Sequence, residues 1–282
     1  MTTATLSRPV PTTAPAVGVS RLSFAGVARS EWIKALSLRS VRSSIILSAA
    51  LGIVMSLAIG SALRALFADE PITGTEYLTT ITSFPASLLA LVFGVLGVFL
   101  FASEYASGMI LSTLTAAPRR GLVMAAKATV LTVLSFLVAA AVVAAGVGIG
   151  VVLMPEAAAS IGTMQTLTSL LGTSIYLVAI ALFSFAAAGI LRSTAGAITT
   201  MVAVVFLLPT MLQIAGQLVK WQWLDLVANY LPSSLGMRLG MGAVEATMPG
   251  TPSYGVALLA LAAWVIVPMA VAAKVFFARN AK

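Results

Sequence analysis

Six long apolar runs, separated by short polar segments, dominate the pattern of hydrophobic and polar positions along the chain. A helix needs roughly 20 mostly apolar residues to cross a bilayer, and a charged residue near its centre costs about 2.5–3.5 kcal/mol. Six charge-free stretches meet this requirement, and the spans predicted around them are residues 43–66, 80–103, 126–153, 168–191, 195–219 and 254–274. The pattern therefore predicts an all-α integral membrane protein whose six transmembrane helices form one domain over residues 43–274.

The composition agrees with this class. Of the 282 residues, 60% are hydrophobic and 9% are charged, whereas a soluble domain carries about 25% charged residues. In a soluble chain the net charge of +8 would suggest a nucleic-acid partner. In a membrane protein, Lys and Arg gather in cytoplasmic loops beside anionic headgroups. We therefore expect membrane lipids as partners and no nucleic acid.

The residue types present also restrict the chemistry of the chain. It contains no Cys and no His, which excludes Ser-His-Asp and Cys-His catalysis and metal sites built from thiolate or imidazole. The charge-free stretches within the spans lack the ionisable residues that mark proton relays and ion-coupled sites. We expect no enzyme activity, no metal and no cofactor in this chain. Any energy that it uses should come from another chain, because no Walker phosphate-binding pattern occurs.

The distribution of charge predicts the orientation in the membrane. Six spans place both termini on one side, and if that side is cytoplasmic, all but three of the 16 Lys and Arg residues lie inside. The three outside are Arg64, Lys220 and Arg238. Because Lys and Arg are concentrated in cytoplasmic segments, we predict a multi-pass plasma-membrane protein with both termini in the cytoplasm. Residues 1–20 are expected to be a disordered tail, and residues 275–282 a cytoplasmic tail.

The segment before the first span is amphipathic. Over residues 21–42, one face of a helix would carry Phe24, Ala28, Trp32 and Leu36. A tryptophan at headgroup depth with basic neighbours is typical of a helix that lies along the inner leaflet. We predict an N-terminal interfacial helix here. The alternative, a basic juxtamembrane segment that only sets topology, remains open.

The connection between the fifth and sixth spans, residues 220–252, is too long and too apolar for a simple turn. It predicts one or two short outer helices, with Trp221 and Trp223 as anchors at the membrane interface. A lid over an exit path and simple packing against the ends of the spans are equally open interpretations. In the third span, Ala140, Ala144 and Gly148 form a ridge of small residues that predicts close helix packing.

The segment between the second and third spans is too apolar for a free loop and too polar to cross the membrane. A short helix beginning at Glu104 would carry one apolar stripe, made of Ala106, Met109, Ile110, Thr113 and Leu114. Pro118 and Gly121 would end it, and Arg119 and Arg120 add a basic end. Such a helix suits contact with a soluble partner. Inside the spans, Tyr176 and Gln213 are the most polar large side chains, and thus candidates for a substrate path or for ordinary helix–helix bonds.

Two motifs in the chain resemble the ABC-2 class of ATP-binding-cassette transporter permeases. In these permeases the second span runs into a segment of the form E-x-x-x-G-[TM]-x-x-x-x-L-x-x-x-P-x-R, which is matched here by Glu104, Gly108, Met109, Leu114, Pro118 and Arg120. Met109 stands where many relatives carry Thr. The E-x-x-K segment before their first span is similar to Glu31, Trp32 and Lys34.

The resemblance implies a function as well as a fold. Two permease subunits, identical or different, would pair above two cytoplasmic ABC ATPase subunits that bind ATP and Mg. A cytoplasmic coupling helix would contact the ATPase through Glu104, Tyr105, Gly108, Met109, Leu114, Pro118, Arg119 and Arg120. ATP-driven closure would then move the second and third spans, most commonly for export. The alternative is a non-transporting scaffold or sensor subunit of an envelope or signalling complex.

Overall fold

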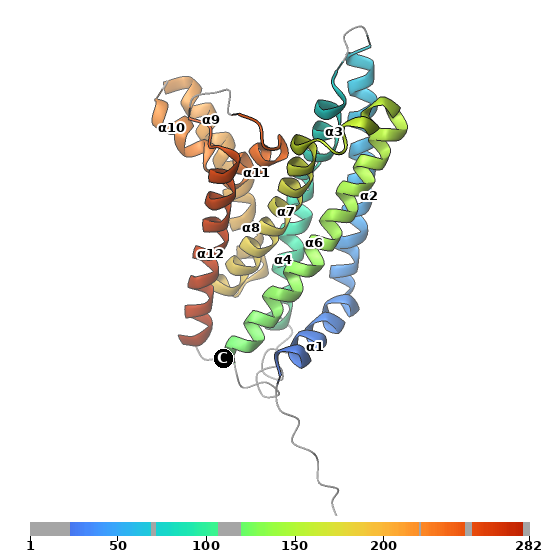
Figure 1. Cartoon of the computed structure of the whole chain (residues 1–282). Coiled ribbons are helices and arrows are strands. Elements are labelled where there is room, and N and C mark those ends of the chain that lie inside the picture. The colour runs from blue at the N-terminus through green and yellow to red at the C-terminus, as the bar shows by residue number, and fades with distance from the viewer. Residues whose placement is uncertain (1–22, 69–71, 107–119, 220, 246–249, 279–282) are drawn as a thin grey trace, which may run out of the picture.

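The computed structural model describes residues 23–68, 72–106, 120–219, 221–245 and 250–278, and within these ranges it is helical and has no strand. Six stretches of these described residues are long and apolar enough to cross a membrane, which confirms the all-α class and the prediction of six helices of this kind (Figure 1). The first four spans are α2 (Arg39–Leu66), α3 with α4 (Gly74–Ser83 and Ala86–Ala106), α6 (Arg120–Leu153) and α7 (Met164–Leu191). The last two are α8 with α9 (Thr194–Val202 and Leu208–Val219) and α12 (Tyr254–Ala278).

Shorter helices connect these spans. α1 (Phe24–Ser37) precedes α2, and a 3-10 turn (Pro155–Ser160) joins α6 to α7. Two short helices, α10 (Gln222–Asn229) and α11 (Pro232–Gly240), lie between the fifth and sixth spans. The indole rings of Trp221 and Trp223 stack there with centroids 6.0 Å apart, and both side chains are exposed.

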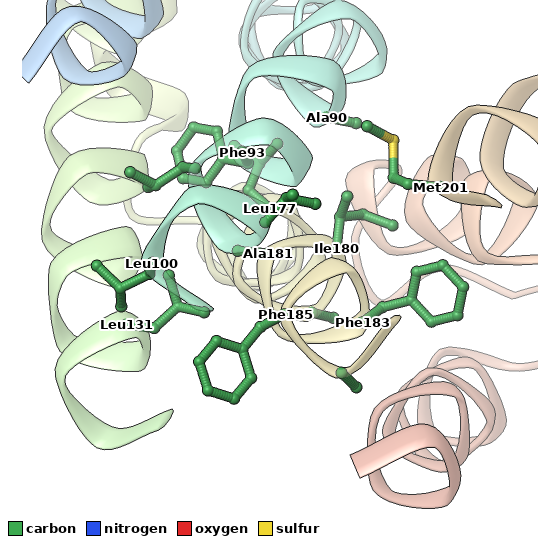
Figure 2. Packing of buried hydrophobic residues seen from close by; sticks show 14 of the residues in the cluster. Ala90, Phe93, Leu100, Leu131, Leu177, Ile180, Ala181, Phe183, Phe185 and Met201 are labelled. Carbon is green, nitrogen blue, oxygen red and sulfur yellow. The ribbon is translucent and has the colours of Figure 1, made fainter. Parts of the chain in front are cut away.

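The core of the bundle is built around α7. In its most apolar stretch 78% of the residues are buried, compared with 22% in α2 and 17% in α12. Figure 2 shows Phe93 of α4, Leu131 of α6 and Met201 of α8 arranged around Leu177 and Ile180 of α7. The less buried spans therefore form the periphery, where their apolar side chains suit contact with lipid.

The contact between α4 and α7 depends on a glycine. A Cβ atom added at Gly97 would lie 2.0 Å from the carbonyl oxygen of Ala181, so the two backbones approach directly. Without a hydrophobic driving force in lipid, small residues stabilise such contacts by permitting close packing. Farther along the same interface, the rings of Phe101 and Phe185 meet edge to face with centroids 5.0 Å apart.

The prediction that Ala140, Ala144 and Gly148 of the third span form a close-packing ridge is wrong for contacts within this chain. Ala144 and Gly148 are exposed, and a Cβ added at Gly148 would meet no atom within 4 Å. The glycines that pack are Gly146, whose Cβ would lie 3.1 Å from the Ser56 hydroxyl oxygen, and Gly150. A straight helix carries small residues on several faces, and only its neighbours determine which face is used.

Prolines interrupt the second and fifth spans. Pro85 has no N–H to donate to the carbonyl of Ile81, and the hydroxyl of Ser56 from α2 donates to that carbonyl instead, at 3.2 Å. In the fifth span, a π-helical turn over Ala203–Leu207 precedes Pro209. The bend at Pro85 separates α3 from α4 and forms one wall of a cavity described below.

The connecting elements gather at the two ends of the bundle (Figure 1). One end holds α1, the last turn of α4, the first turn of α6 and the end of α12. The opposite end holds α3, α10 and α11. There Arg238 is buried, and its guanidinium donates to the carbonyls of Pro252, Gly242 and Val244 at 3.0, 3.0 and 2.6 Å. These bonds tie Gly242, Val244 and Pro252, which lie between α11 and α12, to α11.

Candidate functional site

The predicted coupling residues divide into two groups. Gly108, Met109, Leu114, Pro118 and Arg119 lie outside the residues that the structure describes. Three residues at the edges of this segment lie within helices: Glu104 and Tyr105 in the last turn of α4, and Arg120 at the start of α6. The sequence predicts Glu104 in the first turn of a separate helix, but α4 continues through Glu104 to Ala106, since no Gly or Pro lies between Gly97 and Ala106 to interrupt it.

Arg120 connects the start of α6 to the end of α12. Its Nη1 atom donates to the carbonyl oxygen of Phe276 at 3.4 Å, in the last turn of α12. A Cβ added at the neighbouring Gly121 would lie 3.3 Å from the ring of Phe277. A cation at the C-terminal end of a helix is favourable because the last carbonyls have no partner within the helix.

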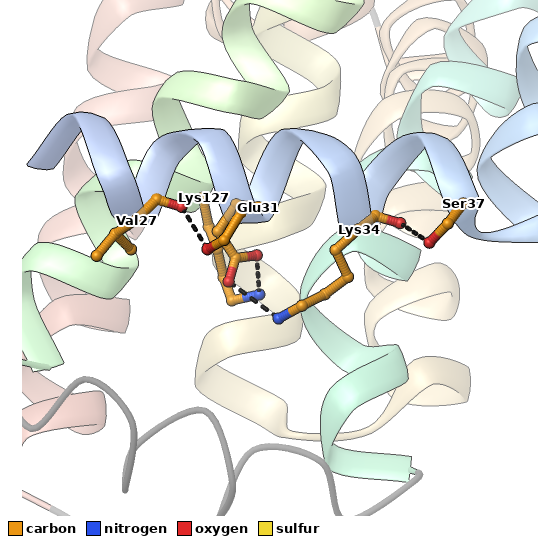
Figure 3. Close-up of polar contacts among 6 residues, drawn as sticks. Val27, Glu31, Lys34, Ser37 and Lys127 are labelled. Carbon is orange, nitrogen blue, oxygen red and sulfur yellow. Dashed lines mark hydrogen bonds and ion pairs between the residues drawn. The ribbon is translucent and has the colours of Figure 1, made fainter. Parts of the chain in front are cut away.

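The most concentrated electrostatic site among the described residues joins α1 to α6 (Figure 3). The Glu31 carboxylate accepts from Lys127 Nζ at 2.6 Å and from Lys34 Nζ at 3.0 Å. Glu31 and Lys127 are only 4% and 3% exposed, so this ion pair is excluded from solvent. Lys34 keeps 25% of its side chain exposed and lies at the edge of the site.

The local sequence explains how Glu31 reaches this position. The Ser23 hydroxyl caps α1 by accepting from the backbone N–H of Gly26 at 3.1 Å. Val27, Glu31 and Ala35 then recur at intervals of four residues and form the buried stripe of the helix. Val27 packs against Val123 and Ala126 of α6. The carboxylate therefore lies in an apolar seam, where an unpaired charge would be costly.

This arrangement differs from the amphipathic face that the sequence indicates. Phe24 and Leu36 of that face are exposed, Trp32 is half-buried against the main core, and α1 docks on α6 through the neighbouring stripe. The sequence analysis found Glu31 and Lys34 but missed Lys127, which lies 96 residues from Glu31. In the sequence, Lys127 is marked only by its position at the edge of the third span. No pattern of neighbouring residues indicates that it pairs with Glu31.

Tyr176 lines a cavity at the opposite end of the bundle. The cavity has a volume of about 190 Å³ and lies between α3, the start of α4, α7 and α11. Tyr176 is 3% exposed, and its ring lies against α11 at Gly236, where an added Cβ would be 2.4 Å from the ring. Gln213, the other candidate for a substrate path, lies on an exposed face of α9 and does not line this cavity. The structure therefore does not bring the two residues together there.

The described residues include no group of three or more acidic side chains that could hold a metal ion. The bundle thus has a buried ion pair between Glu31 of α1 and Lys127 of α6 at one end. At the other end it has a cavity lined with hydroxyl groups. In comparisons with known proteins, no protein-family model matches the chain, and no curated protein matches it.

Proposed function

We propose that this chain is the membrane-spanning permease subunit of an ATP-driven ABC transporter, working as an exporter with a separate ATPase chain that binds ATP and Mg. The observation that carries the proposal is the segment from Glu104 to Arg120, whose residues match the ABC-2 pattern between two membrane-spanning helices. This segment would contact the ATPase and transmit its closure to α4 and α6.

The arrangement of the described helices supports such a role. α4 and α6 both pack against α7 at the core of the bundle, so a displacement of either helix would change its packing against α7. α1 is joined to α6 by the buried pair of Glu31 and Lys127, and Arg120 joins α6 to α12. A force applied between α4 and α6 would therefore act on a connected set of helices rather than on one loop.

We expect the purified chain to bring with it an ATPase chain that carries a Walker motif and has no membrane span of its own. Reversing the charge at Arg119 and Arg120, by Arg119→Glu with Arg120→Glu, should reduce the recovered ATPase roughly tenfold, because the basic end of the segment would meet an acidic surface. Quantitative mass spectrometry of the solubilised complex would measure this ratio.

Two controls separate contact from general effects. Arg39→Glu with Arg42→Glu makes the same change of charge on exposed positions at the start of α2, at the same end of the bundle, and should leave the ratio unchanged. Arg119→Glu alone avoids the bond between Arg120 and Phe276. The coupling role would be contradicted if the recovered ATPase stayed unchanged in Arg119→Glu with Arg120→Glu, in Arg119→Glu alone and in Gly108→Pro. If no ATPase chain is recovered and the function of the protein does not depend on ATP hydrolysis, a scaffold or sensor subunit would be favoured instead.

The proposal also requires that the end of the bundle holding α1 faces the cytoplasm. Because the chain has no cysteine, single cysteines can report this directly. We expect Gly162→Cys, at an exposed turn before α7, to react with a membrane-impermeant maleimide on intact cells. Ser37→Cys, exposed at the end of α1, should react only after permeabilisation. The reverse pattern would contradict the orientation, and the cysteine-free chain is the control for background.

A further inference from the structure

The cavity beside Tyr176 contains hydroxyl groups that have no partner within the described chain. Five of them line it: Thr80, Ser83, Ser87, Tyr176 and Ser233. None of the five side chains donates to or accepts from another described residue. Thr82 and Ser174, on the same helices, donate to the carbonyls of Leu78 and Leu170 four residues earlier, at 2.7 and 2.9 Å. The Thr79 hydroxyl also lines the cavity but donates to the Glu76 carbonyl at 3.1 Å. The other five hydroxyls keep their hydrogen-bonding capacity for something else.

The walls of the cavity are held by bonds that do not involve these five hydroxyls. The start of α7 binds the end of α11, since Gln165 Nε2 donates to the Met241 carbonyl at 3.3 Å and the hydroxyl of Ser169 donates to the carbonyl of Gly240. Thr168 Oγ1 accepts from the backbone N–H of Ala243 at 2.8 Å. On the other side, the bend at Pro85 is stabilised by Ser56. A binding site with walls fixed in this way loses little conformational entropy when it is occupied.

The lining also restricts the charge and the size of an occupant. No acidic or basic side chain lines the cavity, so a charged occupant would meet no side chain of opposite charge there. Hydroxyl groups both donate and accept, and thus suit an alcohol, a phenol, an amide or a carbonyl group. Met237 adds an apolar surface beside them. The volume of about 190 Å³ exceeds the roughly 150 Å³ of an engineered cavity that holds benzene.

We infer that this cavity is a binding site for a small neutral molecule that carries a hydroxyl or carbonyl group beside a single ring or a short apolar chain. Tyr176 donates to or accepts from the polar group, and the Ser and Thr hydroxyls at the bend between α3 and α4 complete its hydrogen bonds. The inference does not depend on the chain being a transporter subunit, because it rests only on lining residues that belong to this chain.

The test uses two matched probes and fluorine NMR. The full-length chain in lipid nanodiscs is titrated with 4-fluorobenzyl alcohol and with 4-fluorotoluene, which lacks the hydroxyl group. Empty nanodiscs correct for partition into lipid. We expect saturable binding of the alcohol and binding of the toluene at least three- to tenfold weaker, since one neutral hydrogen bond accounts for a difference of roughly this size.

Variants then locate the site. Tyr176→Phe keeps the ring against Gly236 and should weaken binding of the alcohol roughly three- to tenfold, while Tyr254→Phe, which removes a hydroxyl bonded to the Thr168 carbonyl outside the cavity, should not. Ser233→Leu fills the cavity and should abolish binding. Ser234→Leu, at the next position of α11, does not line the cavity and should leave binding unchanged. Thr80→Val provides a second test if Tyr176→Phe fails to fold.

Three results would overturn the inference. Equal binding of the two probes would mean that the hydroxyl groups do not recognise the ligand. Binding unchanged in Tyr176→Phe, Thr80→Val and Ser233→Leu would place the probe elsewhere. No saturable binding of either probe would mean that the hydroxyls of the cavity are satisfied by water alone.

Discussion

Replacing Glu31 with methionine should lower the free energy of unfolding by about 3–5 kcal/mol, because the buried ammonium of Lys127 would lose the carboxylate that lies 2.6 Å from it. Lys127→Met should cost a similar amount, since the buried carboxylate of Glu31 would lose its 2.6 Å partner and keep Lys34, whose side chain is 25% exposed. For a chain of this length, such losses correspond to a fall in Tm of about 6–15 °C. The fraction of protein that survives heating, measured by size-exclusion chromatography in detergent, would give the shift.

The double variant Glu31→Met with Lys127→Met tests whether the single variants lose stability because they leave one buried charge without the other. Two apolar side chains of similar volume in the seam between Val27 and Val123 should restore most of the lost stability, because neither charge then remains buried. Lys34→Met serves as the matched control. Its side chain is 25% exposed, and Glu31 would keep Lys127 at 2.6 Å, so the loss should be smaller than in Lys127→Met. Additive losses in the double variant would show that Glu31 and Lys127 do not stabilise each other.

Replacing Gly97 with alanine should destabilise the fold by about 3 kcal/mol or more, at the upper end of the range for overpacked cores. The added Cβ would lie 2.0 Å from the carbonyl oxygen of Ala181, and a backbone atom inside a helix cannot rotate away as a side chain can. α4 and α7 would have to separate along the interface that holds Phe93 and Leu177. The same heating assay would measure the loss.

Gly148→Ala provides the matched control for this prediction. It makes the same chemical change inside another span, where an added Cβ meets no atom within 4 Å. Alanine is favoured over glycine in a helix by about 0.5–1 kcal/mol, so this variant should be neutral or slightly stabilising. Equal effects of the two substitutions would mean that α4 and α7 do not approach as closely as described.

The family resemblance and the structure indicate different surroundings for Glu31 and Lys34. Glu31 and Lys34 belong to a motif that suggests an interfacial helix, yet the structure shows the carboxylate of Glu31 buried against α6. In the proposed transporter, α1 would therefore move together with α6 rather than slide freely along the membrane. The Glu31 and Lys127 variants test this joint through stability, independently of any ATPase.

Much of the fold was predictable because the relevant signal is local. A span is recognised by the polarity of about 20 consecutive residues, and the six charge-free stretches of this chain correspond to the six spans. The sequence analysis predicts an unbroken second span over residues 80–103 and misses its interruption at Pro85, which cannot donate the helical hydrogen bond. The carbonyl of Ile81 accepts from Ser56, but nothing in the order of residues identifies that serine as its partner.

The sequence by itself determined the all-α class and the six helices long and apolar enough to cross a membrane, because hydropathy and charge are properties of neighbouring residues. Only the tertiary structure decided that Lys127 faces Glu31, that Gly146 and Gly150 pack while Gly148 does not, and that hydroxyls from three helices meet around Tyr176. These are contacts between distant segments. In an almost uniformly apolar chain, several faces of each helix are equally suited to packing, so the choice depends on the shapes of the neighbouring helices.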